Sequence, residues 1–369
     1  MEKAGLNQKE IKARNLSSVL YLLNENENIG RKDIAELLSL TPAAVTKLCG
    51  ELIEAGLISE VGEDGGSAKA GRKKIKLSLN LKSFYCVCIN AEVDKVTVSL
   101  ARFDGKLIES RELELTQDIE KIIDTAKKLL ANTEVEKDRI VCASICVLGK
   151  VDDSSFGYWD NAEMIRLAEE RLSLPVVIDN NIQAFALAEM IFAKRSSENN
   201  VLFLKWGPGI ASAIARYGAI LSGENSDVTE IGHYIINTNG RKCRCGRYGC
   251  LETEVSTMQI LSEVDGRYTL DGIISSDDLA VRAIIDTKID LVALALTNTA
   301  TILNSDKVIL FGSLFNNGYV SQKLAIQCKR YNDNFSEDTI ALSELNGKIT
   351  YIGPVALAAK NFFFDVKCN

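Results

Sequence analysis

One histidine and three cysteines lie between positions 233 and 250, and together they have the chemistry of a metal site. His233 is the only histidine in the chain, and Cys243, Cys245 and Cys250 follow it. One imidazole and three thiolates form a closed tetrahedral set, which is the coordination of structural rather than catalytic zinc. A redox thiol cluster and a chance cysteine-rich loop are the alternatives, but neither explains the position of the single histidine. We therefore expect a structural zinc ion that holds this loop in shape.

The remaining cysteines lie in apolar stretches of sequence and are expected to be small buried core residues. They are Cys49, Cys86, Cys88, Cys142, Cys146, Cys328 and Cys368. The N-terminus lacks the layout of a secretory signal, and no uncharged apolar run reaches membrane-spanning length. We therefore expect a cytoplasmic protein, because a reducing compartment favours free thiols and metal ligands over disulfides.

The composition indicates a globular protein of more than one domain with an uneven charge distribution. Of its 369 residues, 46% are apolar and 25% are charged, and this length is enough for two or three domains. A formal net charge of −7 would by itself argue against a nucleic-acid partner. Between positions 69 and 82, however, every charged residue is basic, which indicates a small basic module joined to a larger acidic domain. These bases are Lys69, Arg72, Lys73, Lys74, Lys76 and Lys82.

The N-terminal segment has the pattern of a helix-turn-helix. Apolar residues at helical spacing predict one helix over residues 11–23 and a short one over residues 34–38. Thr41 is placed to cap a further helix, with Pro42 at its first position, where a missing N–H costs little. The N-terminal end of such a recognition helix enters the major groove of DNA. The residues expected at this interface are Thr41, Pro42, Ala43, Ala44, Thr46 and Lys47.

A basic hairpin follows this helix. Residues 57–79 are expected to form a strand, a glycine-containing loop and a returning strand. Arg72, Lys73 and Lys74 in the loop would contact phosphates or the minor groove, as the wing of a winged helix does. A helical protein-interaction module with a solvated charged loop is the alternative. The order of turn, cap and basic wing favours a winged helix-turn-helix over residues 1–82 that binds double-stranded DNA.

From residue 83 onward, apolar strands alternate with amphipathic helices. The pattern occurs in two halves and predicts an α/β domain of two lobes with mixed sheets and helical crossovers. Ligands of such domains collect at strand ends and in the crevice between the lobes.

The segments "EIGH" and "CRCGRYGCLE" resemble the signature of the ROK family, which comprises repressors, open reading frames and sugar kinases. "PVVIDNNIQAFALAE" and "VILFGSL" resemble further family segments, and the "AGRKK" wing is similar to that of the repressor branch. The resemblance covers essentially the whole chain and implies an actin-like (ribonuclease H-like) fold. It implies a ROK sugar-binding domain over residues 83–369, with a first lobe of about 83–185 plus the C-terminal helix and a second lobe of about 186–350.

The same resemblance implies a set of sugar-facing residues. It places Asn180, Glu230, His233 and Glu252 around the sugar, since all four residue types match the family's pattern. Carboxylates and amides bind vicinal hydroxyls through directed hydrogen bonds. Zinc would orient His233 through one ring nitrogen and leave the other to face the ligand. Asn181 is expected to add a hydrogen bond. The alternative for the two glutamates is that they are ordinary surface acids.

The position of the catalytic base in the family's kinases is altered in this chain. The resemblance aligns Asn181 with the catalytic aspartate, and a neutral amide cannot take up the proton of a reacting hydroxyl. Loss of a positioned base typically lowers the rate by ~10²–10⁴. Asp179 could take this role only through a slipped alignment, and neighbouring side chains on a strand point to opposite faces.

The turns that resemble the kinases' phosphate-binding segments are altered as well. Glu92 would place a negative charge and a side chain where a phosphate would sit. The replaced positions are Asn90, Glu92, Ala211, Ala213 and Ser313, while Gly207, Gly209 and Gly312 remain.

A sensor must bind its sugar but has no need to bind a nucleotide, so a retained sugar site beside an altered nucleotide site fits a sensor. We therefore predict a sugar-responsive transcriptional regulator without catalytic residues, a repressor of carbohydrate-use genes such as those for xylose. The alternative is an ATP-dependent sugar kinase of the family with an added DNA-binding domain. The expected partners are an operator in double-stranded DNA, a monosaccharide or phosphosugar effector, and further copies of the chain in a homodimer or homotetramer.

Overall fold

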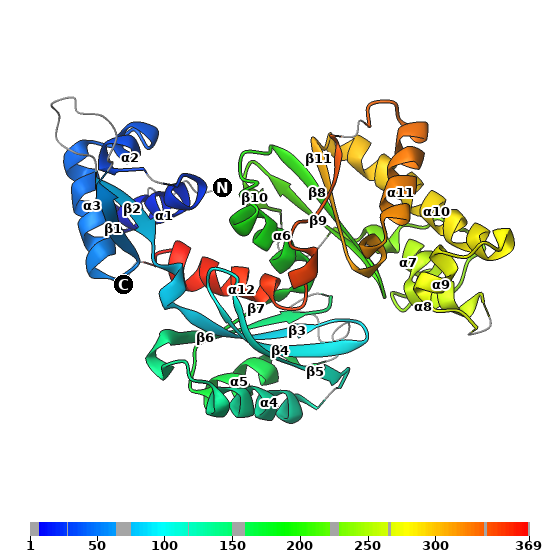
Figure 1. Ribbon diagram of the computed structural model, residues 1–369, viewed down its shortest axis with the longest axis horizontal. Coiled ribbons are helices and arrows are strands. Elements are labelled where there is room, and N and C mark those ends of the chain that lie inside the picture. The colour runs from blue at the N-terminus through cyan, green and yellow to red at the C-terminus, as the bar shows by residue number, and fades with distance from the viewer. Residues whose placement is uncertain are drawn as a thin grey trace.

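The computed structural model describes residues 7–27, 29–63, 75–116, 118–149, 159–221, 229–264, 267–335 and 338–367. A small N-terminal domain, blue in Figure 1, lies beside two larger α/β lobes. Two helices, α6 and α12, lie between the sheets of these lobes. No helix in the described ranges combines the length and the apolar character that crossing a membrane requires.

The N-terminal domain consists of three helices followed by a two-stranded antiparallel sheet. Thr41 caps α3 as expected, since its side chain accepts a hydrogen bond from the N–H of Ala44 at 3.3 Å and Pro42 occupies the first turn. The burial of Ile34, Val45 and Leu77 fixes the helices against the hairpin. The elements are α1 (Gln8–Glu25), α2 (Arg31–Leu37), α3 (Pro42–Glu54), β1 (Ile58–Glu63) and β2 (Ile75–Leu79).

The first lobe is a five-stranded mixed sheet in the order β5-β4-β3-β6-β7. β3 pairs antiparallel with β4 and parallel with β6, and β6 pairs parallel with β7. Two amphipathic helices cover the outer face of this sheet (Figure 1). The elements are β3 (Tyr85–Ala91), β4 (Lys95–Arg102), β5 (Leu107–Glu114), α4 (Ile119–Asn132), β6 (Ile140–Val147), α5 (Asn161–Leu172) and β7 (Val176–Asn180).

The second lobe has a sheet in the order β10-β9-β8-β11-β12, in which β8 is parallel to β11 and antiparallel to β9. Its strands are β8 (Asn200–Trp206), β9 (Ile210–Arg216), β10 (Ala219–Ile220), β11 (Lys307–Phe311) and β12 (Ile340–Leu342). Its helices are α7 (Leu251–Val255), α8 (Thr257–Ser262), α9 (Leu270–Ile274), α10 (Leu279–Leu303) and α11 (Gly318–Tyr331).

The two helices between the lobes are apolar on nearly all sides because both sheets pack against them. They are α6 (Asn181–Phe192) and α12 (Ile352–Ala359). At Gly353 the helices approach so closely that an added Cβ would lie 3.2 Å from the backbone nitrogen of Phe185. The ring of Phe185 stacks on Phe311 of the second lobe, with centroids 4.0 Å apart. The start of α6 is thereby held by residues from both lobes.

The N-terminal domain packs against the C-terminal segment of the chain. The Tyr21 ring of α1 stacks on Phe364, which lies in the turn of π-helix (Lys360–Phe364) that follows α12. Asn24 of α1 donates a hydrogen bond to the carbonyl of Ile191 in α6 at 2.8 Å. Buried residues of α1, α6 and α12 belong to one hydrophobic cluster. The N-terminal domain therefore shares a core with the two-lobed domain.

Several sequence expectations can be compared with this fold. Six of the cysteines expected in the core are buried, and the seventh, Cys368, lies outside the described residues. The helical spacing of apolar residues in α3 predicts that Ile53 is buried, but it is half-buried, because it lies at the margin of the α3 face that packs on the other helices. Ile75 begins the apolar alternation of β2 but is 40% exposed, since the pairing of β2 with β1 is shifted there.

Candidate functional site

A narrow pocket between the lobes collects the residues that resemblance assigned to sugar binding. Asn180 and Asn181 reach it from the junction of β7 and α6, and Glu230, His233 and Glu252 reach it from the second lobe. Its volume is about 100 Å³, which is well below the ~300–1,000 Å³ of pockets for drug-sized molecules. A pocket of this size suits a single small ring.

Asn180 is held rigidly because it ends a strand and caps a helix at once. Its side-chain oxygen accepts hydrogen bonds from the backbone N–H groups of Ile182 at 2.8 Å and Gln183 at 3.3 Å. Its amide nitrogen donates to the carbonyl of Gly149 at 2.6 Å. Capping of this kind satisfies N–H groups that the first helical turn leaves unpaired.

Asn181 is the first residue of α6 and is almost fully buried. Its side-chain nitrogen donates to the carbonyl of Ala91, at the end of β3, at 2.8 Å. One N–H of the side-chain amide is used in this way, so its second N–H and the side-chain oxygen remain to meet a ligand. That oxygen accepts hydrogen bonds but takes no proton at neutral pH.

Asp179 lies on the other side of β7, as the alternation of a strand predicts. It lines a separate cavity of about 410 Å³, together with Tyr21 and Asn24 of the N-terminal domain. Burial raises the pKa of its carboxyl, although the N–H of Asn180 and the charge of Lys360 act in the opposite direction. Asp179 is not among the residues that line the pocket between the lobes.

Ion pairs surround the pocket. Arg244 lies 3.3 Å from Glu252, and Arg247 lies 3.7 Å from Glu230. Lys205 of β8 pairs with Glu92 at the end of β3. Sequence analysis did not identify Lys205 or Arg244 as pocket residues. A lysine inside the otherwise apolar strand of residues 200–206 was the available signal, because an unpaired charge is rarely buried.

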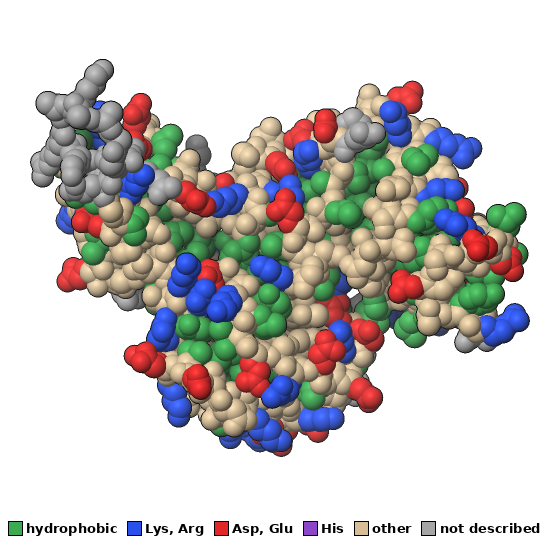
Figure 2. Space-filling view, in the orientation of Figure 1, with side chains coloured by type: hydrophobic (Ala, Val, Ile, Leu, Met, Phe, Trp, Pro, Cys, Tyr) green, Lys and Arg blue, Asp and Glu red, His purple; other side chains and the backbone are tan. Residues whose placement is uncertain are grey.

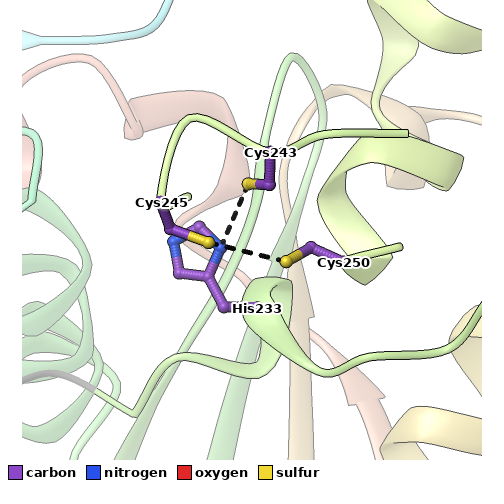
Figure 3. A group of neighbouring side chains, drawn as sticks. All are labelled: His233, Cys243, Cys245 and Cys250. Atoms are coloured by element: carbon purple, nitrogen blue, oxygen red, sulfur yellow. Dashed lines mark hydrogen bonds between the residues drawn. The ribbon is translucent and has the colours of Figure 1, made fainter. Parts of the chain in front are cut away.

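His233 and the three cysteines converge on one point, as Figure 3 shows. Their ligand atoms all lie within 4.8 Å of one another. Cys243 Sγ lies 3.6 Å from His233 Nδ1, and Cys245 Sγ lies 3.6 Å from Cys250 Sγ. Tetrahedral ligands at zinc distances of ~2.0–2.3 Å are separated by roughly 3.4–3.8 Å. The donor types and these separations fit a four-coordinate metal ion.

The loop that carries the cysteines depends on two glycines. Gly246 and Gly249 have φ of +86° and +68°, a conformation that L-residues with side chains rarely adopt. A side chain at Gly249 would also collide with the carbonyl of Asn237. Burial alone would raise the pKa of Cys245, but hydrogen bonds from Arg247 lower it to about 7, which favours the thiolate that binds metals.

The expected phosphate-binding turns border a second crevice, of about 220 Å³, next to the pocket. Glu92 lines it, and Asn90 donates a hydrogen bond to Glu92 at 3.2 Å. Gly207, Gly312 and Ser313 lie on its far side, where the Ser313 hydroxyl is 2.9 Å from the position of an added Cβ at Gly207. The remaining replaced positions are Ala211, which lines the pocket between the lobes, and Ala213, which is buried in the core.

The residues proposed for DNA contact lie on the exposed side of α3, except that Ala44 is half-buried. The hydroxyl of Thr46 donates to the carbonyl of Pro42 at 2.8 Å, so it is available to a base edge as an acceptor. Arg72, Lys73 and Lys74 lie outside the described residues. On the face shown in Figure 2, acidic and basic side chains are interspersed over the first lobe.

These features define a winged-helix DNA-binding protein joined to a two-lobed domain of the sugar-kinase type. A model of a winged helix-turn-helix DNA-binding domain matches residues 14–59, and the model of the ROK family matches residues 86–361. The chain belongs to the ROK family.

Its relatives include proteins named as repressors and as transcriptional regulators. A putative xylose repressor from Caldicellulosiruptor sp. (strain Rt8B.4) is 26% identical, with 94% of this chain and 96% of the relative covered. The DNA-binding transcriptional dual regulator NagC of Escherichia coli (strain K12) is 27% identical over 69% of this chain and 65% of its own length.

Solved structures confirm the fold. A ROK family transcriptional regulator described as a homologue of the E. coli Mlc protein has a TM-score of 0.79 at 21% identity, covering 96% of this chain and 98% of its own. A ROK family glucokinase from Streptomyces griseus, in complex with glucose and AMPPNP, has a TM-score of 0.63 at 18% identity. It covers 75% of this chain and 99% of its own. The expected winged helix and actin-like domain are thereby confirmed, and the repressor relatives favour a regulator over the kinase alternative.

Proposed function

We propose that this protein is a transcriptional repressor of carbohydrate-use genes, xylose genes among them, and that a sugar in the pocket between the lobes controls its binding to DNA. The observation that carries this proposal is the convergence of Asn180, Asn181, Glu230, His233 and Glu252 on one pocket, in a chain that also has a DNA-binding domain. The repressor names of several relatives support it.

The chemistry of the pocket suits a polyol. Carboxylate oxygens of Glu230 and Glu252 accept hydrogen bonds from hydroxyl groups, and the amide oxygen of Asn181 adds a neutral acceptor. The Nδ1 of His233 faces Cys243, so its other ring nitrogen is the one available to a ligand. Zinc would be held by His233, Cys243, Cys245 and Cys250, and it would supply a crosslink that fixes the imidazole and the loop.

We further propose that the pocket binds its sugar without phosphorylating it. The acceptor at the start of α6 is an amide, and the neighbouring carboxyl of Asp179 lines a different cavity. The pair of Glu92 and Lys205 lies between the pocket and the crevice where phosphates would enter. A proton acceptor and an open path to the phosphate are both needed for transfer to a hydroxyl.

The segment of residues 179–183 is suited to carry the signal to DNA. Asn180 and Asn181 face the sugar pocket, whereas Asp179 and Gln183 line the cavity that contains Tyr21 of α1. A sugar that favours one position of this segment would favour one position of the DNA-binding domain. In a homodimer or homotetramer this shift changes the spacing of two recognition helices, and so their fit to half-sites about one DNA turn apart.

The DNA contacts belong to the exposed side of α3, at residues 41–47, and to the basic residues 72–74 of the wing. A cytoplasmic location accords with this role and with the reduced thiols of the cluster.

The proposal is tested by titrating the full-length protein onto operator fragments from the gene's own upstream region, at fixed salt, with a panel of sugars. A sugar that changes the DNA affinity at least tenfold, without consumption of ATP, supports the proposal. If no sugar changes the affinity, or if sugar-dependent ATP consumption is found, the proposal is wrong.

A further inference from the structure

Lys205 and Glu92 form an ion pair that joins the two lobes. Lys205 lies in β8 of the second lobe, and Glu92 lies directly after β3 of the first. The side chains are only 13% and 11% exposed, so water screens this pair much less than a surface pair. Asn90 donates a further hydrogen bond to Glu92 at 3.2 Å. Both charges are therefore engaged within the protein.

The same two residues border both cavities of the interlobe region. Glu92 and Lys205 line the pocket that contains Asn181 and His233, and they also line the crevice that contains Gly207 and Gly312. The pair therefore separates the proposed sugar pocket from the crevice bordered by the turns that resemble phosphate-binding segments. A phosphate attached to a sugar hydroxyl at this end of the pocket would meet the pair.

Among the described residues that line the pocket, each lysine and arginine is already paired with a carboxylate. Lys205 is paired with Glu92 and Arg244 with Glu252, and the third lining carboxylate is that of Glu230. Carboxylates therefore outnumber cations among the lining residues that the structure describes. A phosphate monoester carries a charge of ~−1.5 to −2 at neutral pH, and its burial without a free cation is unfavourable.

We infer that the effector is an uncharged monosaccharide rather than a phosphosugar, and that Glu92 is the residue that rejects the phosphate by occupying Lys205. This inference rests on the proposed function, because it specifies the ligand of the same pocket. It also assigns a function to Glu92 in the altered phosphate turn. Glu92 would select the unphosphorylated sugar in addition to disfavouring the binding of a nucleotide phosphate.

The experiment compares full-length protein with xylose, glucose, mannose and N-acetylglucosamine and with the 6-phosphate of each hexose, using calorimetric binding and DNA affinity. The expected result is that at least one free sugar binds at least tenfold more tightly than its phosphate. Glu92→Gln is expected to reduce this preference at least tenfold, because it frees the ammonium group of Lys205. The double variant E92Q/K205Q is expected to retain the preference for free sugar, since it contains no freed cation.

Glu112→Gln is the matched control, because Glu112 forms an exposed pair with Lys95 at 2.7 Å in the same sheet and does not line the pocket. It is expected to leave the preference unchanged. Tighter binding of a phosphosugar to the natural protein would overturn the inference and leave the proposed function intact. An unchanged preference in folded E92Q would remove the role of Glu92. If E92Q does not fold, the comparison in the natural protein still decides the ligand class. Failure of every sugar and phosphosugar to bind or to alter DNA affinity counts against the proposed function itself.

Discussion

The hydroxyl of Tyr21 donates a hydrogen bond to the carboxylate of Asp365 at 2.9 Å, across 344 positions of sequence. The Tyr21 ring also stacks on Phe364, with centroids 4.9 Å apart. This contact joins the first helix of the DNA-binding domain to the segment that follows α12. The orientation of the DNA-binding domain is therefore set in part by residues of the sugar-binding domain.

Substitution of Tyr21 is expected to weaken the coupling between sugar and DNA. Tyr21→Ala removes a stacked, half-buried ring and should lower the free energy of unfolding by about 2 kcal/mol, whereas Tyr21→Phe removes only the hydrogen bond and should cost about 1 kcal/mol. The ratio of DNA affinities with and without sugar, measured by fluorescence anisotropy, should approach one in Tyr21→Ala. A folded variant with the full natural ratio would show that this contact does not carry the signal.

Removal of one metal ligand should release the metal and abolish the sugar response. In Cys250→Ser a closed set of four ligands loses one thiolate, so metal content measured by mass spectrometry should fall from about one ion per chain to near zero. The thermal midpoint should fall as well, and chelator should have no further effect on the variant. Cys328→Ser is the control, since Cys328 is a fully buried thiol outside the cluster. Full metal content and normal sugar affinity in Cys250→Ser would contradict the ligand assignment.

Restoring a carboxylate at the start of α6 is not expected to restore a kinase. Asn181→Asp supplies a positioned base, and such a base typically raises a reaction rate by ~10²–10⁴. Glu92 and Lys205 nevertheless still lie between the pocket and the crevice where phosphates would enter. A coupled assay of ADP release should therefore give the same background rate for the natural protein and the variant, with each sugar of the panel. Sugar-dependent ADP release by the variant would show that the nucleotide side is intact.

The buried carboxyl of Asp179 predicts a specific pH dependence of stability. Its pKa is raised by burial, so the ionised group makes the folded state less stable at neutral pH than a neutral group would. This cost disappears as the pH falls through the folded-state pKa, where the carboxyl takes up its proton. Asp179→Asn should therefore have a higher thermal midpoint than the natural protein at pH 7, and the difference should shrink toward pH 4.

The control for this experiment is Asp138→Asn, at an exposed position, for which the midpoint difference should stay near zero over the same pH range. A midpoint difference for Asp179→Asn that is constant with pH would mean that the charge of Asp179 is not the cause.

The basic wing should contribute to DNA affinity regardless of sequence. Changing Arg72 and Lys73 to Ala should weaken binding to operator and to non-operator DNA by similar factors. It should also reduce the slope of log affinity against log salt concentration by about one for each lost phosphate contact. Lys127→Ala, on the outer helix α4, is the control and should change neither the DNA affinities nor the salt slope. If only operator binding weakens, the two wing residues read bases instead of phosphates.

Local patterns were sufficient to predict much of the fold and part of the site. Thr41 and Pro42 mark a helix start by their own chemistry, and the alternation of residues 176–180 was enough to place Asp179 and Asn180 on opposite faces. Lys205 and Arg244 could not be assigned to the pocket, because the partner of Lys205 lies far away in sequence and Arg244 itself lies in a loop without periodic structure. The contact of Tyr21 with Asp365 has no local signal at all, since it depends on how the end of the chain returns across the first lobe.

Part of the surface that α1 packs against is formed by residues 360–366, which a ribosome adds more than three hundred residues after α1 itself. During synthesis the DNA-binding domain therefore emerges long before this part of its contact surface. Until residues 360–366 have been made, the growing chain lacks these contacts between α1 and the sugar-binding domain. Regulation by ligand thus becomes available only when translation of this segment is complete.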